Sequence, residues 1–369
     1  MKKIGIITFH RADNYGAVLQ NYALQQVIKS RDFDVETIDY CYEDIDKVYD
    51  LRYVKRGDTL KKVINHTLAY ILNYRVKKKR KDKFDIFRKS QLSLSTTYTS
   101  KEILGGAFVD SYDVIITGSD QVWNPQLVKG EAINVYTLHF QANAKKIAYA
   151  ASAGGENAFT DMLLSKISSI DEISVREKSL QKWIQGNGIP AQCVCDPVLL
   201  LSKEFWIRKF GKKSKNNKYL FLYYVGSEDK IRRKKTCELT RKIAKKKKLS
   251  IRCASTINPD TFMVGHNVFS DGPKEFLNEI INADFVIASS FHAVAFSIIF
   301  EKQFITVLHE NTGSRVKDFL EMLNLSDRIA FGYDILKDEL PLIDYNKVNK
   351  KLDEYISLST NILFSMLKN

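Results

Sequence analysis

The chain has 369 residues, of which 44% are hydrophobic and 27% are charged, with only 6 prolines. This composition excludes a fibrous or disordered chain, and the length favours about two domains. Lysine and arginine exceed aspartate and glutamate by 57 − 43 = 14, so the protein attracts anions without specifying which kind.

The first part of the chain predicts a strand, a helix and a second strand. Residues 3–9 form an apolar, β-branched run, residues 17–30 carry an apolar helical face, and residues 35–38 predict the next strand. The loop that follows the first strand lies at its carboxyl end, where open α/β sheets bind ligands. Residues 44–90 are strongly basic and predict a helical insertion, with apolar residues at helical spacing between Leu60 and Leu72 that we expect to pack on the core.

The remainder of the chain continues this alternation of strands and helices. Further strands are predicted at residues 113–117, 146–150, 173–176, 219–225, 250–254, 284–288 and 304–308. Such alternation predicts an α/β protein with two Rossmann-like lobes built on parallel sheets. We assign residues 1–205 to an N-terminal lobe, 206–345 to a C-terminal lobe, and 346–369 to a final helix that could cross back to the first lobe.

The cysteines and the apolar runs predict a cytoplasmic location. Five cysteines show no disulfide-like spacing, and their odd number argues against a secreted, disulfide-stapled domain. The apolar run after Met1 is too short for a signal peptide, and no run approaches the ~20 apolar residues of a spanning helix. The basic insertion could still dock the protein on the inner membrane face.

The segment 287–300 predicts an apolar strand that leads directly into an apolar helix, and the turn between them carries Ser289, Ser290 and His292. Unpaired N–H groups and the positive end of the helix dipole make a helix start suited to an anion. An alternative is that the serines only cap the helix and that the histidine packs in the turn.

Five motifs in sequence order resemble the polysaccharide pyruvyl transferase family: DNYGAVLQNYAL (13–24), ITGSDQVWNP (116–125), SVRE (174–177), CDPVLLL (195–201) and SSFHAVAFSIIF (289–300). The resemblance covers nearly the whole chain and is weakest in the basic insertion. It implies a bilobed, glycosyltransferase-B-like fold. It also implies transfer of the pyruvyl group of phosphoenolpyruvate to two sugar hydroxyls as a cyclic ketal, in surface polysaccharide biosynthesis.

The resemblance also implies roles on the donor side. Arg176 matches the arginine expected to bind phosphoenolpyruvate, and His292 matches the histidine at the reacting centre, as proton donor or as a clamp on the leaving phosphate. We expect Ser289 and Ser290 to hold anionic oxygens and Arg315 to reach the same phosphate, unless Arg315 is simply exposed at a helix start. Family members often have arginine and glycine beside this histidine, where this chain has Phe291 and Ala293.

Other residues of the first lobe are candidates for binding the acceptor. Asn14, Tyr15 and Gly16 form a turn with a ring suited to a sugar face. Asp120 could accept a hydroxyl proton or cap the turn after it, and Trp123 could form an apolar platform or belong to the core.

We expect no metal site and no cofactor. Cys193 and Cys195 lack a second pair of ligands at zinc spacing, and no glycine pattern matches a dinucleotide or ATP site. Phosphoenolpyruvate would be a co-substrate, and a divalent ion is left open. The acceptor would be a sugar, a nucleotide sugar or a lipid-linked oligosaccharide, and we expect no nucleic acid partner.

Two alternatives stay open at this point. The first is a glycosyltransferase that uses a nucleotide-sugar donor on the same scaffold. The second is a non-catalytic basic protein that binds anions or a membrane surface. If the enzymatic hypothesis holds, we expect that His292→Ala and Arg176→Ala each abolish transfer without changing thermal unfolding.

Overall fold

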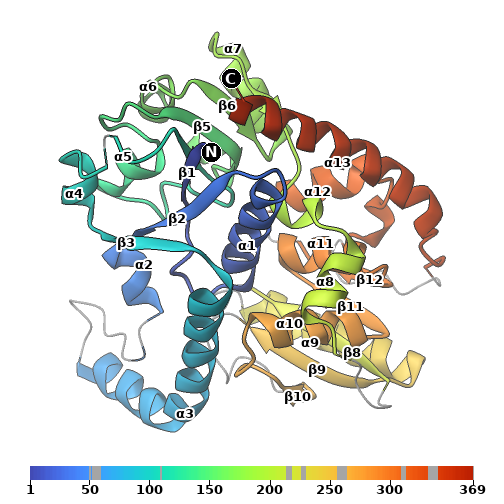
Figure 1. Cartoon of the computed structure of the whole chain (residues 1–369). Coiled ribbons are helices and arrows are strands. Elements are labelled where there is room, and N and C mark those ends of the chain that lie inside the picture. Colours follow the sequence, from blue (N-terminus) through green and yellow to red (C-terminus); the bar gives the residue numbers. More distant parts are fainter. Residues whose placement is uncertain are drawn as a thin grey trace.

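The computed structural model describes residues 1–49, 51, 60–108, 110–212, 218–225, 230–255, 264–308, 313–330 and 340–368. These residues form two α/β lobes joined side by side, with the final helix lying across both (Figure 1). The predicted pair of parallel-sheet lobes is confirmed. No helix in the described ranges combines the length and the apolar character needed to cross a bilayer.

The first lobe contains a seven-stranded parallel sheet in the order β3-β2-β1-β4-β5-β6-β7. Its strands are β1 (Lys3–Ile7), β2 (Asp34–Tyr40), β3 (Leu94–Tyr98), β4 (Val114–Thr117), β5 (Lys145–Ala151), β6 (Glu172–Val175) and β7 (Gln192–Cys193). The central strand β4 is buried along its whole length, as expected for a parallel sheet covered on both faces. The helices of this lobe are α1 (Tyr15–Lys29), α2 (Glu43–Val48), α3 (Leu60–Gln91), α4 (Ser100–Leu104), α5 (Ala132–Tyr136), α6 (Asp161–Ile167) and α7 (Lys178–Gly186).

The second lobe contains a five-stranded parallel sheet in the order β10-β9-β8-β11-β12. Its strands are β8 (Tyr219–Tyr224), β9 (Ser250–Ser255), β10 (His266–Asn267), β11 (Phe285–Ala288) and β12 (Phe304–Thr306). Its helices are α9 (Lys230–Lys247), α10 (Pro273–Asn282), α11 (Phe291–Ile299) and α12 (Ser314–Met322). The predicted boundary between residues 205 and 206 falls inside α8 (Lys203–Phe210). The short strands β3, β7 and β10 were not predicted, because they lack a long apolar run.

The last helix, α13 (Tyr345–Lys368), crosses back to the first lobe, as predicted (Figure 1). Its first half places Val348 and Leu352 in the core shared with the second lobe. Its second half packs Leu363 and Leu367 among residues of the first sheet. Lys2 also donates to the carbonyl of Lys368 at 2.8 Å, so the two ends of the chain are held together.

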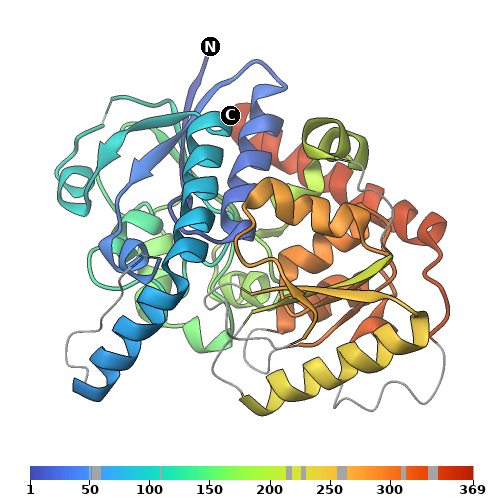
Figure 2. The same ribbon diagram turned by 90° about the horizontal axis from the view of Figure 1, so that it is seen from below.

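The basic insertion forms α2 and α3, and α3 runs beside α1 to reach α10 of the second lobe (Figure 2). Most of the apolar residues expected to pack, between residues 60 and 72, have side chains outside the described part of the chain. Ile71 is described and is 63% exposed. The packing is made further along the helix, where Phe84 and Phe87 are buried in the core shared by both lobes.

One contact between the lobes, which we call the α3 seam, consists of Tyr15, Arg80, Phe84, Asp271 and Phe276. The Tyr15 ring stacks on Phe276 at 4.2 Å between centroids, and its hydroxyl donates to the carbonyl of Asp271 at 2.7 Å. Arg80 is 4% exposed and lies 4.4 Å from the centre of the Tyr15 ring. Part of the basic run at 75–83 therefore joins the two lobes instead of facing solvent.

Candidate functional site

Six buried charged or titratable residues come together where the two lobes meet, and we call them the buried-charge cluster. They follow the carboxyl ends of β4, β6 and β7 in the first lobe and occupy the first turns of α11 and α12 in the second. None is more than 9% exposed. The members are Asp120, Arg176, Glu177, Asp196, His292 and Arg315.

Arg176 links the carboxylates of the first lobe. Its Nη1 donates to Asp196, and its Nη2 lies 3.5 Å from Asp120 Oδ1. Burial by itself would lower the pKa of Arg176, but Asp196 and the neighbouring carboxylates outweigh burial and raise it. The guanidinium also lies 4.9 Å from the centre of the Phe291 ring. The residue that departs from the family pattern thus packs directly against the predicted donor-binding arginine.

Asp196 is fully buried and holds the two lobes' cations together. Its Oδ1 accepts from the backbone N–H of Val198 at 3.1 Å, and its Oδ2 lies 3.3 Å from His292 Nε2. Burial would raise the pKa of Asp196, but His292 and Arg176 hold it well below its ordinary value, so the side chain is an anion. Sequence reasoning missed this residue, although a carboxylate inside the apolar CDPVLLL motif was a usable signal.

His292 lies in the first turn of α11, which Ser290 caps by accepting from the N–H of Ala293 at 3.1 Å. The ring sits between Asp196 and Gly16 of the first lobe. A Cβ atom on Gly16 would lie only 2.1 Å from His292 Nδ1, so the close approach requires glycine. Although Nε2 is near Asp196, it makes no hydrogen bond of good geometry with any residue in the described ranges. The Asp196 carboxylate at 3.3 Å is its nearest charged neighbour.

Glu177 and Arg315 form the other end of the cluster. Ser152 donates to Glu177, and Arg315 Nε lies 3.8 Å from Glu177 Oε1. Within the described part of the chain, Arg315 Nε and Glu177 Oε2 are buried without a hydrogen-bond partner. Burial raises the pKa of Glu177 despite the two nearby arginines, and burial together with Arg176 lowers the pKa of Arg315. Glu177, within the SVRE motif, is the second residue that sequence reasoning missed.

A cavity of about 500 Å³ adjoins the cluster. Arg176, Asp196 and Arg315 line one side of it, and Tyr355 and Leu358 of α13 line another. An anion in this cavity would meet two guanidinium groups that carry unsatisfied donors, and unsatisfied buried donors are costly unless a ligand pairs with them.

The remaining predicted donor-side residues have structural partners. Ser289 Oγ accepts from the N–H of Val225 at 2.6 Å, and Ser290 is occupied as the cap of α11. On the acceptor side, Asn14 caps α1 by accepting from Gly16 at 3.0 Å. Ser290 therefore matches the capping alternative that the sequence left open, whereas Ser289 contacts the backbone of Val225 instead of capping the helix.

Two aromatic predictions are not supported by the packing. Tyr15 is 1% exposed, and its ring is covered by the α3 seam. Trp123 is 3% exposed, and its Nε1 donates to the carbonyl of Tyr136 at 3.1 Å. Neither ring offers a free face to a sugar, because large aromatic side chains gain more free energy in the core.

No group of three or more His, Cys, Asp or Glu side chains in the described ranges is placed to hold a metal ion. The five cysteines are free.

The comparisons with known proteins identify the family and the fold of the chain. Residues 14–311 match the model of the family described as polysaccharide pyruvyl transferase. No curated protein matches the sequence. Among solved structures, a putative UDP-N-acetylglucosamine 2-epimerase from Listeria monocytogenes aligns over 99% of this chain and 95% of its own, with a TM-score of 0.55 and 10% identity.

A second solved structure shows the same fold. The UDP-GlcNAc 2-epimerase from Neisseria meningitidis aligns over 100% of both chains, with a TM-score of 0.53 and 11% identity. At this identity the likeness concerns the glycosyltransferase-B-type fold alone. The family match, in contrast, spans most of the chain and contains every member of the buried-charge cluster except Arg315. This chain therefore belongs to the polysaccharide pyruvyl transferase family.

Proposed function

We propose that the protein transfers the pyruvyl group of phosphoenolpyruvate to two hydroxyls of a sugar, as a cyclic ketal, in surface polysaccharide biosynthesis. One observation carries the proposal beyond the family match. Arg176 and Arg315 are buried side by side next to a cavity, and each has an Nε–H with no partner in the described part of the protein.

The donor's charges fit this arrangement. Phosphoenolpyruvate carries a carboxylate and a phosphate, and guanidinium groups bind both in bidentate fashion. Arg315 is buried beside another cation, which lowers its pKa. A bound anion would offset this repulsion and the cost of burial.

The reaction needs three proton movements. The first sugar hydroxyl adds to C2 of phosphoenolpyruvate, its proton goes to a base, and C3 receives a proton and becomes a methyl group. The C2–O bond to phosphate then breaks. The second hydroxyl adds to C2 and closes the ring, and its proton leaves with the inorganic phosphate.

Two residues of the cluster could carry these steps. His292 is placed to donate a proton or to hold the departing phosphate, because its Nε2 has no good hydrogen bond and lies 3.3 Å from the Asp196 carboxylate, which stabilises an imidazolium. Asp120, at the carboxyl end of β4, is the base for the sugar hydroxyl. Asp196 acts as a positioning residue, since it contacts both Arg176 and His292.

Incubation with phosphoenolpyruvate and a sugar acceptor tests this function. We expect phosphate release that depends on the acceptor and a ketal methyl signal by NMR. His292→Ala should reduce the rate by at least about 10³-fold, as expected for loss of general acid catalysis together with a phosphate contact. Release of a nucleoside diphosphate from a nucleotide sugar, without any use of phosphoenolpyruvate, would contradict the proposal and support a glycosyltransferase.

The structure changes one expectation about the variants. Arg176→Ala would leave the buried Asp196 carboxylate without its ion-pair partner, and breaking a buried pair costs about 3–5 kcal/mol of stability. Unchanged thermal unfolding is therefore no longer expected for Arg176→Ala. Arg176→Lys, which keeps the positive charge, is the better variant for testing donor binding.

We also propose that the protein works in the cytoplasm and that exposed lysines could bring it to an anionic membrane. Lys245, Lys246 and Lys247 are exposed at the end of α9, and each cation near an anionic surface contributes about 1 kcal/mol. The insertion contributes less than the sequence predicted, because Arg80 and Arg88 are buried. Equal flotation with neutral and anionic liposomes would exclude membrane contact.

A further inference from the structure

A second cavity lies in the first lobe, outside the carboxyl ends of β1 and β2. Its volume is about 510 Å³, and its walls come from the loop after β1, from α2 and from α3. The carboxyl ends of parallel strands are the usual ligand-binding edge of such a sheet. Because β1 pairs directly with β4, this cavity and Asp120 lie at the same edge.

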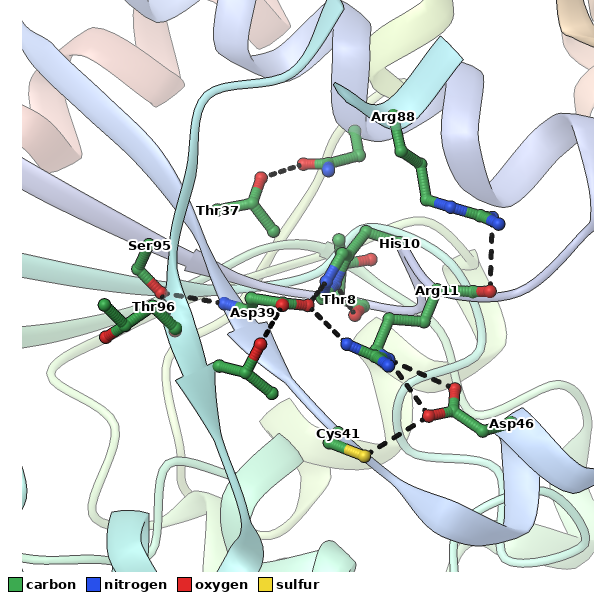
Figure 3. A network of polar contacts seen from close by, with 12 residues as sticks. Thr8, His10, Arg11, Thr37, Asp39, Cys41, Asp46, Arg88, Ser95 and Thr96 are labelled. Carbon is green, nitrogen blue, oxygen red and sulfur yellow. Dashed lines mark hydrogen bonds and ion pairs between the residues drawn. The ribbon is translucent and has the colours of Figure 1, made fainter. Parts of the chain in front are cut away.

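A fixed polar network forms one wall of this cavity (Figure 3). His10 is 1% exposed, and its Nε2 lies 2.8 Å from Asp39 Oδ1, while Thr97 donates to the other oxygen at 2.6 Å. Burial would raise the pKa of Asp39, but the hydrogen bonds from His10 and Thr97 hold it well below its ordinary value. Asp39 is thus a permanent anion whose contacts fix neighbouring groups.

The network holds Arg11 at the cavity. Arg11 Nη1 donates to Asp39 at 2.9 Å and Nε donates to Asp46 at 3.0 Å. Arg88, which is 7% exposed, donates to the Arg11 carbonyl at 3.2 Å and to Asp13 at 2.8 Å. The loop is therefore preorganised, which lowers the entropic cost of binding a ligand there.

The α3 wall carries two lysines without an ion pair in the described part of the chain, together with Asp85, which pairs with Arg88. Lys81 is half-buried and Lys89 is exposed, and both line the cavity. Neither has an ion-pair partner among the residues that the structure describes. Asp46 and Glu43 stand opposite, on α2. Carboxylates beside cations suit a ligand with many hydroxyls and one anionic group, since hydroxyls donate to carboxylates and phosphates accept from lysines.

Tyr49 connects the cavity to the buried-charge cluster. It lines the cavity, and burial raises the pKa of its hydroxyl to about 12. The hydroxyl interacts with Asn14 and lies within electrostatic reach of Asp120. The loop between β1 and α1 likewise has Arg11 at the cavity and reaches Gly16, which touches His292. The segment that lines this cavity is therefore continuous with residues that contact the buried-charge cluster.

We propose that this cavity binds the phosphate of a glycosyl phosphate, with Lys81 and Lys89 as the phosphate contacts and the sugar directed toward Asp120. The assignment rests on the proposed function, because it makes this ligand the acceptor of the pyruvyl group. The shared chemistry is a sugar joined through its anomeric oxygen to phosphate, as in nucleotide sugars and in lipid-linked sugars.

Calorimetry on the full chain tests the cavity without relying on turnover. The probes are glucose, galactose and mannose 1-phosphates, each compared with its free sugar, and phosphoenolpyruvate is titrated separately. We expect at least one glycosyl phosphate to bind more tightly than its free sugar. Lys81→Gln/Lys89→Gln should weaken that binding by about tenfold, since loss of two partly solvated charge contacts typically costs this much.

A matched control removes the same charge elsewhere. Lys101→Gln/Lys350→Gln changes two exposed lysines outside the cavity and should bind every probe as the wild type does. Two further probes are a nucleotide sugar and a short prenyl-diphosphate sugar in detergent, and their affinities are compared with that of the best glycosyl phosphate. The probe that binds more tightly identifies the source of the ligand.

The outcomes separate this proposal from the transfer reaction. Binding of phosphoenolpyruvate with no preference for any glycosyl phosphate over its free sugar overturns the cavity assignment and leaves the proposed reaction standing. Wild-type affinity in Lys81→Gln/Lys89→Gln also overturns it. If a glycosyl phosphate binds in a way that depends on both lysines while phosphoenolpyruvate does not bind, the cavity assignment is supported. The same result contradicts phosphoenolpyruvate as the donor.

Discussion

The α3 seam and the buried-charge cluster both bury arginine between the lobes, but they satisfy it differently. Arg80 donates to the carbonyls of Asp13, Phe269 and Asp271 at 3.0–3.4 Å and lies against aromatic rings. Arg315, in contrast, has one carboxylate at 3.8 Å and an Nε with no partner in the described part of the chain. Arg80 therefore has a full set of contacts within the fold, whereas the incomplete contacts of Arg315 are the feature on which its proposed role in binding an anion rests.

The largest expected effect is on stability at the α3 seam. Arg80→Ala should lower the free energy of unfolding by about 3–5 kcal/mol, because it removes a buried guanidinium and leaves its acceptors unsatisfied. Donor binding, measured below the unfolding temperature, should change less than about tenfold. Lys79→Ala, at an exposed neighbouring position, is the control for denaturant unfolding. If Arg80→Ala is as stable as the wild type, Arg80 does not stabilise the α3 seam, and the proposed contrast with Arg315 of the buried-charge cluster is wrong.

The opposite result is expected in the cluster. Arg315→Gln should weaken phosphoenolpyruvate binding by about a hundredfold, equivalent to about 2.7 kcal/mol, while stability should fall by less than in Arg80→Ala, because the contact that is lost is the 3.8 Å ion pair with Glu177. Calorimetry and thermal unfolding measure the two quantities. Lys317→Gln, on the same helix but exposed, should alter neither. Loss of stability with unchanged affinity would make Arg315 a structural residue like Arg80.

A third prediction concerns the contact between Gly16 and His292. Gly16→Ala should reduce kcat by about tenfold and stability by about 1–3 kcal/mol, because the new Cβ displaces the imidazole. Gly186→Ala is a suitable control, since a Cβ there would meet nothing within 4 Å. If Gly16→Ala keeps full activity, the position of the ring is not critical to catalysis.

The smallest expected effect is the pH dependence of Glu177→Gln. Burial raises the pKa of Glu177 above its ordinary value of 4.5, so the folded protein binds this proton more tightly than the unfolded chain does. Stability therefore falls as pH rises from about 4.5 to the folded-state pKa. Glu177→Gln should gain about 1 kcal/mol relative to the wild type across that window. For the exposed control Glu238→Gln, the difference in stability from the wild type should not change with pH. A pH-independent difference for Glu177→Gln would contradict a raised pKa for the Glu177 carboxyl.

Sequence patterns predicted most of the long elements because their signals are local. The apolar runs of β1, β4 and β11 and the helical pattern of α13 are each visible within one segment. The strands β3 and β7 were missed because they lack an apolar run, and their pairing with a neighbouring strand decides that they are strands. Hydrogen-bonded pairing between neighbouring strands depends on tertiary contact, which no local pattern reveals.

The candidate site was predicted in part. His292, Arg176, Arg315 and Asp120 were chosen from the turns and motifs that carry them, and the structure brings them together. Asp196 and Glu177 were missed, since each becomes notable only when burial places it against cations from another segment. Tyr15 was taken for a sugar platform, because the sequence does not show that Phe276 covers its ring.

Local sequence patterns predicted the longer strands and helices, the helix start that carries His292 and the family motifs, because these depend on residues close together in the chain. Only the tertiary structure decided which charges are buried together, that α3 joins the lobes, and that Gly16 touches the imidazole. These features depend on strand order and on the docking of two lobes, which bring side chains more than 100 residues apart into contact, as with Gly16 and His292.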